Sequence, residues 1–229
     1  MHRSPLALRM ASKEVIRKVS EEISRAIRAP FSGSYISGGG GGGSGASTFI
    51  IQDENTKQEY FVKMADLGGF DMLRTEYEGI KVMHETNSIR VPEPICYGSS
   101  DYNAFAVFEK LSLGGRADPA TSGRKLAELH THSSPNEKFG WDFANTCGAT
   151  PQPNQWCDTW AEFWDTQRLG HILDLANRSG GNFPEAAELR AKVKSILEKH
   201  ECVPSAVHGD LWGGNIGATK SGDPVIYGI

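Results

Sequence analysis

The sequence predicts an α+β protein with two lobes, a small β-rich lobe followed by a mainly helical one. Two patterns predict this fold. From residue 31 to 112, short apolar segments alternate with turns around a single helical pattern. Beyond residue 113, apolar residues recur three and four positions apart. The composition is that of a folded globular chain, because 38% of the 229 residues are apolar and 23% are charged.

Residues 1–30 are predicted to form a helical segment ahead of the first lobe. Apolar residues recur on one helical face from Ser12 onward, namely Val15, Ile16, Val19, Ile23 and Ile27. Met1–Lys13 carries basic residues and no acid, as the start of a transit peptide does, but no uninterrupted apolar core of a secretory signal follows. We expect a cytoplasmic protein, with a plastid or mitochondrion as the alternative.

The first lobe (31–112) is expected to consist of strands and one helix. Residues 37–47 are almost all glycine and serine, and we expect them to form a loop before the first strand. A polar turn at 53–57 separates two short strands, and the lobe ends near Leu113. The predicted elements are strands Thr48–Ile51 and Tyr60–Lys63, helix Asp71–Glu85 and strand Ala104–Leu111.

The second lobe (113–229) is expected to be mainly helical. Residues 139–156 are rich in glycine, proline, asparagine and threonine and predict a loop. Short apolar segments follow at 207–216 and 224–227. The predicted helices are Gly123–His130, Asp158–Leu175 and Ala186–His200.

Charge and cysteine content argue against several classes of protein. The formal net charge of −4 gives no basic field, so nucleic acid is not an expected partner. No apolar run has the length needed to cross a bilayer, so no membrane partner is expected either. The four cysteines are scattered without a CxxC pair, which favours free thiols over a zinc site or a disulfide framework.

A glycine-rich segment is the first of four features that occur in the order of a kinase. Glycines let backbone N–H groups approach phosphate oxygens without a Cβ in the way. We assign Gly42, Gly43, Ser44 and Gly45 to the phosphates of a nucleotide, although the sequence does not show which glycines matter. The alternative is a flexible low-complexity linker. No Gly-Lys-Ser/Thr follows, so this is not a Walker loop.

The second feature is Lys63, at the end of a predicted strand that precedes a helix. In protein kinases such a lysine contacts the α- and β-phosphates and pairs with a glutamate on the next helix. Glu76 is the candidate partner, and Glu78 is the nearest alternative. A lone lysine at a strand end is more often simply solvated.

The third feature, Glu109-Lys110-Leu111, follows a buried strand where a kinase hinge would offer backbone groups to adenine. We assign Glu109 and Leu111 to nucleotide binding because they lie between Glu76 and the helical lobe. Their side chains alone say little.

The fourth and most specific feature is the segment HGDLWGGN, residues 208–215. It follows the kinase catalytic-loop pattern H-x-D with an asparagine five residues after the aspartate. Asp210 would accept the proton of the attacking hydroxyl, Asn215 would hold Mg²⁺ on the phosphates, and His208 would brace the loop. The alternative is a chance match to the pattern, which the three preceding features in kinase order argue against.

These segments resemble a known family. His-Gly-Asp in place of His-Arg-Asp is similar to the aminoglycoside-phosphotransferase side of the kinase superfamily, and HGDLWGGN resembles the HGDLWSGN block of the ketosamine kinases. The resemblance runs from about Ile36 to Tyr227. Further matching blocks, in order, are IRVPEP (89–94), GRKLAELH (123–130), FGWD (139–142), TPQPNQW (150–156), DTWAEFW (158–164) and QRLG (167–170).

The resemblance implies a protein-kinase-like fold and an ATP- and Mg²⁺-dependent ketosamine 3-kinase. Its substrates would be glycated proteins that carry ribulosamine or fructosamine on lysine, and phosphorylation of the 3-hydroxyl makes such adducts labile. Trp212 lies inside the loop and is assigned to the sugar pocket. The other aromatic residues of the second lobe are expected to pack in its core: Trp141, Trp156, Trp160, Phe163 and Trp164.

Near residue 228 the sequence departs from the family pattern. The resemblance implies a second metal-binding aspartate after the strand 224–227, and Gly228 stands there. The helical lobe is accordingly expected to be incomplete and the activity reduced. We expect a retained intron or a faulty gene model to account for both, because an interrupted aspartate codon read into an intron's GT start becomes GGT, glycine. Genomic sequence after the Tyr227 codon tests this hypothesis.

Two alternative functions stay open at this stage. One is a related kinase for a free sugar, choline or an aminoglycoside. The other is a pseudokinase-like fragment that binds nucleotide or a partner protein, which the glycine at 228 favours.

Overall fold

The computed structural model describes residues 13–39, 46–148 and 150–228. The described chain divides into two compact units. One contains the residues up to Leu126 together with those from His208 onward, and the other contains Ala127–Val207. The lobe boundaries expected from the sequence stay a prediction. No helix within the described ranges is long and apolar enough to cross a membrane.

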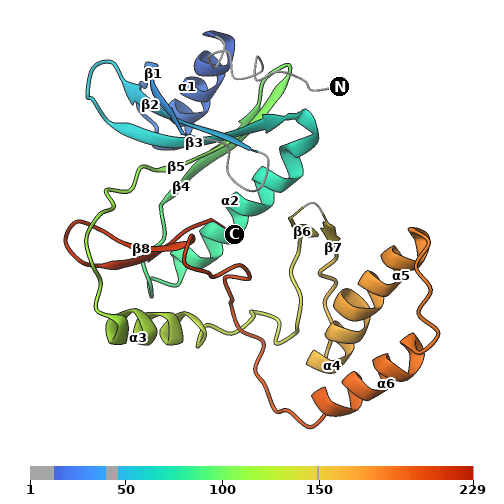
Figure 1. Cartoon of the computed structure of the whole chain (residues 1–229). Helices are drawn as coiled ribbons and strands as arrows, with labels where there is room; N and C mark the ends of the chain where they lie inside the picture. The colour runs from blue at the N-terminus through green and yellow to red at the C-terminus, as the bar shows by residue number, and fades with distance from the viewer. Residues whose placement is uncertain (1–12, 40–45, 149, 229) are drawn as a thin grey trace. The chain divides into compact units, whose positions relative to one another are not determined.

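The first unit is built on a five-stranded antiparallel sheet in the order β1-β2-β3-β5-β4 (Figure 1). Its strands are β1 Gly33–Gly39, β2 Ser47–Asp53, β3 Glu59–Asp66, β4 Pro94–Ser99 and β5 Asn103–Glu109. The expectation that the glycine-rich segment precedes the first strand is wrong. β1 comes earlier and pairs with β2 from Gly33↔Asp53 to Gly39↔Thr48. Glycine and serine are poor strand formers, so β1 depends on pairing with its apolar neighbour.

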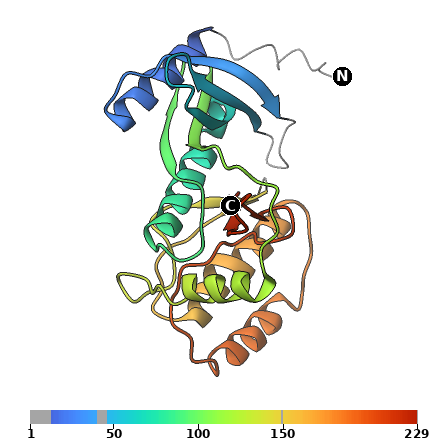
Figure 2. The same cartoon turned by 90° about the vertical axis from the view of Figure 1, so that its left-hand side faces the viewer.

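Two helices cover opposite faces of this sheet (Figures 1 and 2). Helix α1, Lys13–Ile27, buries Val15, Val19 and Ile23 against a cluster that includes Phe105 and Val107 of β5. Helix α2, Phe70–Glu85, lies against the other face, where the Tyr77 ring contacts Phe108 and Tyr97. Successive residues of a strand point to opposite faces, so β5 is buried on both sides and reads as a continuous apolar run. The predicted helix 71–85 is confirmed, the predicted helical segment 1–30 is confirmed over Lys13–Ile27, and the predicted strand 104–111 is confirmed as far as Glu109.

A small hairpin near the end of the chain attaches to the first unit. It consists of β8, Ile216–Ala218, and β9, Pro224–Ile226. The Ile226 N–H donates to the Arg90 carbonyl at 2.9 Å, and Leu113 forms a bridge with Thr219. These bonds join the hairpin to the segments just before β4 and just after β5. Val225 and Ile226 are fully buried there.

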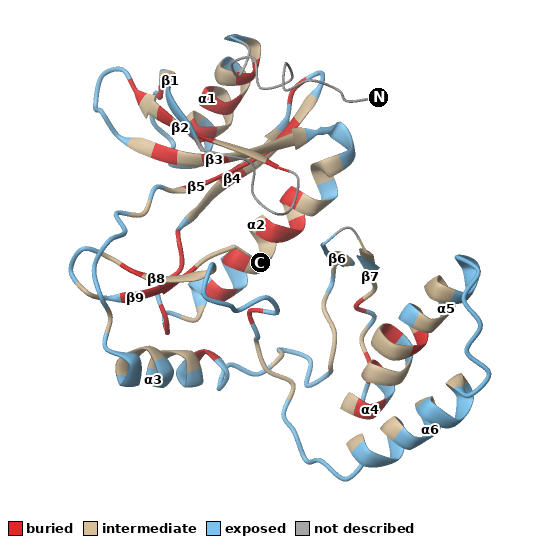
Figure 3. Ribbon diagram, in the orientation of Figure 1, coloured by how far each residue is buried: buried red, intermediate tan, exposed pale blue. Residues whose placement is uncertain are grey.

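The second unit is mainly helical. Its elements are the hairpin β6 Asn145–Cys147 and β7 Thr150–Gln152, α4 Trp160–Phe163, a π-helical turn Trp164–Leu169, α5 Gly170–Arg178 and α6 Ala186–Leu197. Helix α3, Pro119–Leu129, begins in the first unit and ends in the second, because the boundary falls after Leu126. The predicted helix 158–175 is continuous but contains the π-helical turn, in which the Gly170 N–H donates to the Asp165 carbonyl. Figure 3 shows that α6 is largely exposed, whereas most of the buried residues lie in the first unit.

All four cysteines are free thiols, as the sequence predicted. Cys96 lies in the core beside α1, and burial raises the pKa of its thiol to about 12. It therefore stays protonated and packs as a small apolar side chain.

Candidate functional site

Lys63 and Glu76 form an ion pair between β3 and α2. The Lys63 side chain is 19% exposed and that of Glu76 is 8% exposed. β3 places Lys63 between Thr48 of β2 and Ala106 of β5. Glu78, the alternative partner, is half-buried and forms no ion pair among the described residues.

Burial raises the pKa of the Glu76 carboxyl above its ordinary value, and the neighbouring Lys63 ammonium acts in the opposite direction. Breaking a buried ion pair by removing one partner costs about 3–5 kcal/mol, because the remaining charge is left without compensation. A lysine at a solvated strand end has no such partner to lose. The ion pair with Glu76 therefore holds the Lys63 ammonium in one position over the sheet.

The loop between His208 and Asn215 closes on itself through its aspartate and asparagine. The Asn215 side-chain amide donates to the Asp210 backbone carbonyl and to Asp210 Oδ2, both at 2.9 Å. The Tyr227 N–H donates to the Asn215 carbonyl at 3.0 Å, which ties the loop to the end of β9. Gly209, with φ of +84°, makes the turn before the aspartate. Asp210 itself is exposed, so its carboxylate is held in place and open to a reactant.

His208 is buried beneath this loop, 6% exposed. Its Nδ1 accepts from the Asp210 N–H at 3.3 Å, so the ring proton belongs on Nε2. Nε2 is buried and makes no hydrogen bond of ordinary geometry within the described chain. Burial lowers the pKa of His208, while Asp210 and the Tyr227 backbone oppose the shift. The bracing role of His208 stays a prediction.

Asn215 is the residue that could hold a metal ion. Its amide nitrogen is bound to Asp210, which turns its Oδ1 away from that carboxylate and toward residue 228. A Cβ built on Gly228 would lie 3.0 Å from this oxygen. No group of three or more His, Cys, Asp or Glu in the described chain could hold a metal by itself. The residues present fit an Mg²⁺ ion that is held mainly by nucleotide phosphates and water, with Asn215 as a protein ligand.

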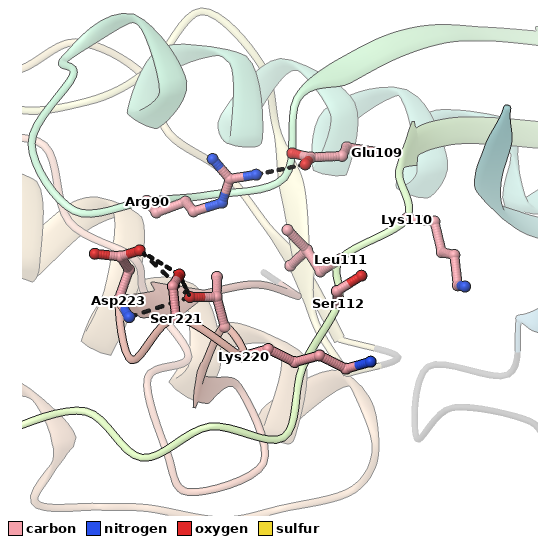
Figure 4. A pocket seen from close by; sticks show the side chains of 9 residues that line it. Arg90, Glu109, Lys110, Leu111, Ser112, Lys220, Ser221 and Asp223 are labelled. Atoms are coloured by element: carbon pink, nitrogen blue, oxygen red, sulfur yellow. Dashed lines mark hydrogen bonds and ion pairs between the residues drawn. The ribbon is translucent and has the colours of Figure 1, made fainter.

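The hinge residues line a different pocket. Glu109 pairs with Arg90, and its N–H donates to the Glu93 carbonyl at 2.8 Å, so this N–H is not available to a base. Glu109 and Leu111 line an open pocket of about 510 Å³ together with Lys220, Ser221 and Asp223 of the β8–β9 turn. Figure 4 shows the Glu109 carboxylate turned toward Arg90 and the Lys110 ammonium turned away from both.

This pocket includes neither the lysine–glutamate pair nor the loop 208–215. Nucleotide contact by Glu109 and Leu111 stays a prediction. Gly42, Gly43, Ser44 and Gly45 lie outside the described residues.

Two features of the site were not visible in the sequence. One is the pair of hydrogen bonds that the Asn215 side-chain amide donates to Asp210, since the spacing suggested only that the asparagine turns back toward a metal. The other is the constraint on Gly214, where a Cβ would overlap with the Trp212 indole. Trp212 is 64% exposed and does not belong to the core.

The sheet with its buried lysine–glutamate pair and the H-x-D loop with its asparagine define a kinase of protein-kinase-like fold. The model of the fructosamine kinase family matches residues 15–228, and the chain belongs to this family.

Relatives agree with this assignment. The chain is 40% identical over 213 residues to a protein of Synechocystis named probable ketoamine kinase, covering 91% of this chain and 70% of that one. It is 37% identical over 172 residues to a chloroplastic protein-ribulosamine 3-kinase of Oryza sativa, covering 73% of this chain and 50% of the relative. A crystal structure assigned as a fructosamine-3-kinase of Haemophilus somnus superposes with a TM-score of 0.77 at 27% identity, covering 92% of this chain and 70% of that one. The chain thus spans between half and about 70% of these relatives.

Proposed function

We propose that this chain carries the site of an ATP-dependent kinase for the 3-hydroxyl of ribulosamine or fructosamine on protein lysines. The observation that carries the proposal is the exposed Asp210 carboxylate fixed by the Asn215 amide at 2.9 Å. The names of the rice and Synechocystis relatives support the substrate class.

In the proposed reaction Lys63, held by Glu76, contacts the α- and β-phosphates of ATP. Asp210 accepts the hydrogen bond of the sugar 3-hydroxyl and takes its proton as the sugar oxygen bonds to the γ-phosphorus. The bond between that phosphorus and the β–γ bridging oxygen breaks, and ADP leaves. Mg²⁺, with Asn215 as a ligand, would neutralise charge on the phosphates when bound. The phosphorylated adduct is labile, which gives the protein a role in deglycation.

A second candidate is a nucleotide-binding protein without transferase activity. The observation that favours it is Gly228, which offers no carboxylate beside Asn215. A related kinase for a free small molecule is the third. The three candidates differ in whether the chain transfers phosphate from ATP and in which acceptor it phosphorylates.

One assay separates them. ATP turnover by the chain is measured with ribated protein, glycated protein and free sugars, and nucleotide binding is measured in parallel. We expect turnover on the protein adducts, and we expect Asp210→Asn to lower kcat by at least about 100-fold at nearly unchanged ATP affinity, as loss of a positioned base does. Asp101→Asn, at an exposed site in the first unit, is the charge-matched control.

Lys63→Ala should instead weaken ATP binding, and Lys63→Arg should restore part of it. Lys81→Ala on the exposed face of α2 is the control. Binding without turnover on any acceptor would favour the second candidate, and turnover confined to free sugars would favour the third.

We further propose a cytoplasmic location, with the plastid or mitochondrion as the alternative; the chloroplastic name of the rice relative supports the plastid. Imaging of the chain with a fluorescent protein fused to its C-terminus distinguishes these compartments.

A further inference from the structure

The second unit contains an aromatic pocket that the proposed reaction does not use. It has a volume of about 410 Å³, and Trp141, Asp142, Pro153 and Trp156 are among the residues that line it. All of its lining residues belong to the second unit, so the pocket is complete within that unit. Both tryptophans are only half-buried, contrary to the expectation that they pack in the core. A concave, mostly apolar surface with a few placed polar groups is the usual form of a binding site.

Asp142 gives this pocket a negative charge. It is the one ionisable residue among the described residues that line the pocket. Its Oδ1 accepts from Trp156 Nε1 at 2.9 Å, which fixes the carboxylate beside the indole. Asp142 is exposed, and its Oδ2 accepts no hydrogen bond within the described chain. A group that enters the pocket therefore meets a charged acceptor that is already held in position.

Asn154 joins the two segments that form the walls of the pocket. It is buried, and its backbone carbonyl accepts from the Trp141 N–H at 2.8 Å. Its Oδ1 accepts from Arg168 at 2.6 Å, and Arg168 also donates to the Pro153 carbonyl at 2.6 Å. These bonds hold the walls in place before any ligand arrives, which lowers the entropic cost of binding.

The carboxylate and the aromatic walls together favour an organic cation. The faces of an indole are negative and attract a cation placed over them. A guanidinium suits this pocket better than an ammonium, because it is planar and can stack on an indole while its edge donates to a carboxylate. It is also more weakly hydrated, so less is lost when it leaves water.

We propose that this pocket docks an arginine side chain of a partner protein, with the guanidinium on Asp142 Oδ2 and against an indole of the pocket. Because Asp142 is exposed and the tryptophans are half-buried, a side chain can enter while the partner's backbone stays outside. Arginine and tryptophan are also enriched among the residues that contribute most to protein–protein binding. The formal net charge of −4 favours a basic partner over an acidic one. This docking site is independent of the proposed phosphoryl transfer.

Fluorine NMR of the chain labelled with 5-fluorotryptophan tests the proposal. The chain has five tryptophans, whose signals are assigned with single Trp→Phe variants. It is titrated with the peptide acetyl-Gly-Arg-Gly-amide and with the same peptide carrying citrulline, which has the shape of arginine without its charge. We expect saturable shifts of the Trp141 and Trp156 signals, and no shift of the Trp212 signal from the first unit.

The arginine peptide should bind about tenfold more tightly than the citrulline peptide, as one charge-assisted contact requires. This preference should weaken as salt is added. Asp142→Asn keeps the shape of the side chain and should abolish the preference. Asp174→Asn makes the same change at an exposed position of the same unit and is the matched control, expected to bind like the parent.

Equal affinities of the parent for the arginine and citrulline peptides would overturn the proposal, as would an undiminished preference in Asp142→Asn. Shifts of the Trp212 signal without shifts of the Trp141 and Trp156 signals would place the peptide elsewhere and reject the pocket. Tighter binding of tetramethylammonium than of the arginine peptide would also contradict the proposal, because it would assign the pocket to a small quaternary amine.

Discussion

His208 lies at the point where the catalytic loop meets the interior of the first unit. Its buried ring accepts a hydrogen bond from the Asp210 N–H. A change in the protonation of the ring therefore alters a bond to the aspartate backbone. Because Nδ1 is the acceptor, a protonated ring would lose this bond and gain a second buried donor.

This environment predicts a pH effect on stability. The folded-state pKa of His208 is lowered by burial, so as pH falls below about 6.5 the unfolded chain takes up a proton that the folded chain does not. Stability should therefore fall with decreasing pH until the folded pKa is passed, with a slope of at most about 1.4 kcal/mol per pH unit for one proton.

His208→Asn retains an acceptor near Nδ1 and cannot titrate. Urea unfolding at pH 7.5, 6.5 and 5.5 should show this slope in the parent and a smaller one in the variant. His130→Asn, on an exposed ring, is the control. Parallel pH curves for all three chains would contradict the assignment.

At the level of single residues the sequence predicted contacts whose geometry follows from order along the chain. A lysine on a strand and a glutamate one and a half turns into the next helix meet because α2 packs back on the sheet beside β3. Trp141 and Trp156 line a pocket of about 410 Å³ and are half-buried. This was not predicted, because aromatic residues at helical or loop positions usually belong to the core.

Among the elements, the helices were the most predictable and β1 the least. α1 and α2 carry apolar side chains at helical spacing. β1 has the sequence GSYISGG, in which only two residues favour a strand, and its place comes from pairing with β2. The π-helical turn was also invisible, since it depends on the backbone bond from Gly170 to Asp165 and on the Arg190–Asp165 ion pair, 2.7 Å from Nε to Oδ1.

Asp53 joins β1 to β2 and gives a second pH prediction. It is 1% exposed and accepts from the N–H groups of Thr56, Asn55 and Ser32. The bond from Thr56 and then that from Ser32 hold the pKa of Asp53 below its usual value of 3.8. Its stabilisation should be complete above pH 3.8 and should disappear as pH falls through the lowered folded pKa.

Asp53→Ala removes the side-chain hydrogen bonds to the turn and to Ser32. The denaturation midpoint of this variant at pH 7 should fall clearly below that of Asp71→Ala, an exposed control at the start of α2. Below pH 3 the parent and Asp53→Ala should approach each other in stability. Equal denaturation midpoints of the two variants at pH 7 would show that the hydrogen bonds of Asp53 contribute nothing to the stability of the folded chain.

On the scale of the whole molecule, the chain returns to its first unit at His208, after 81 residues in the second. The β8–β9 hairpin forms backbone bridges to Arg90 and Leu113, which lie far from it in the sequence. The sequence alone predicts contacts between neighbouring segments and did not predict these bridges. The loop 208–215 is consequently held at both ends, by buried His208 and by the Tyr227 N–H, to a unit built mostly from residues up to Leu126.

Because of this arrangement, we expect the largest gain in metal affinity from a single substitution at Gly228. Its φ is +74°, a conformation that aspartate and asparagine adopt more readily than other side chains except glycine. A Cβ there would point at Asn215 Oδ1, 3.0 Å away, and the resemblance to ketosamine kinases implies an aspartate at this position. Gly228→Asp would therefore place a carboxylate next to an amide oxygen, the pair of oxygen ligands that Mg²⁺ takes beside nucleotide phosphates.

We expect Gly228→Asp to raise the affinity for Mn²⁺ or Mg²⁺ in the presence of ADP by about tenfold or more, because a carboxylate adds a charged ligand to the ion. Calorimetry with the metal titrated into the ADP-loaded chain measures this directly, and electron paramagnetic resonance of Mn²⁺ gives an independent reading. Gly228→Asn has the same shape and the same tolerance of positive φ but no charge, so it separates metal binding from backbone effects. If both variants bind the metal equally well, residue 228 does not face the ion, and Asn215 has been assigned the wrong role.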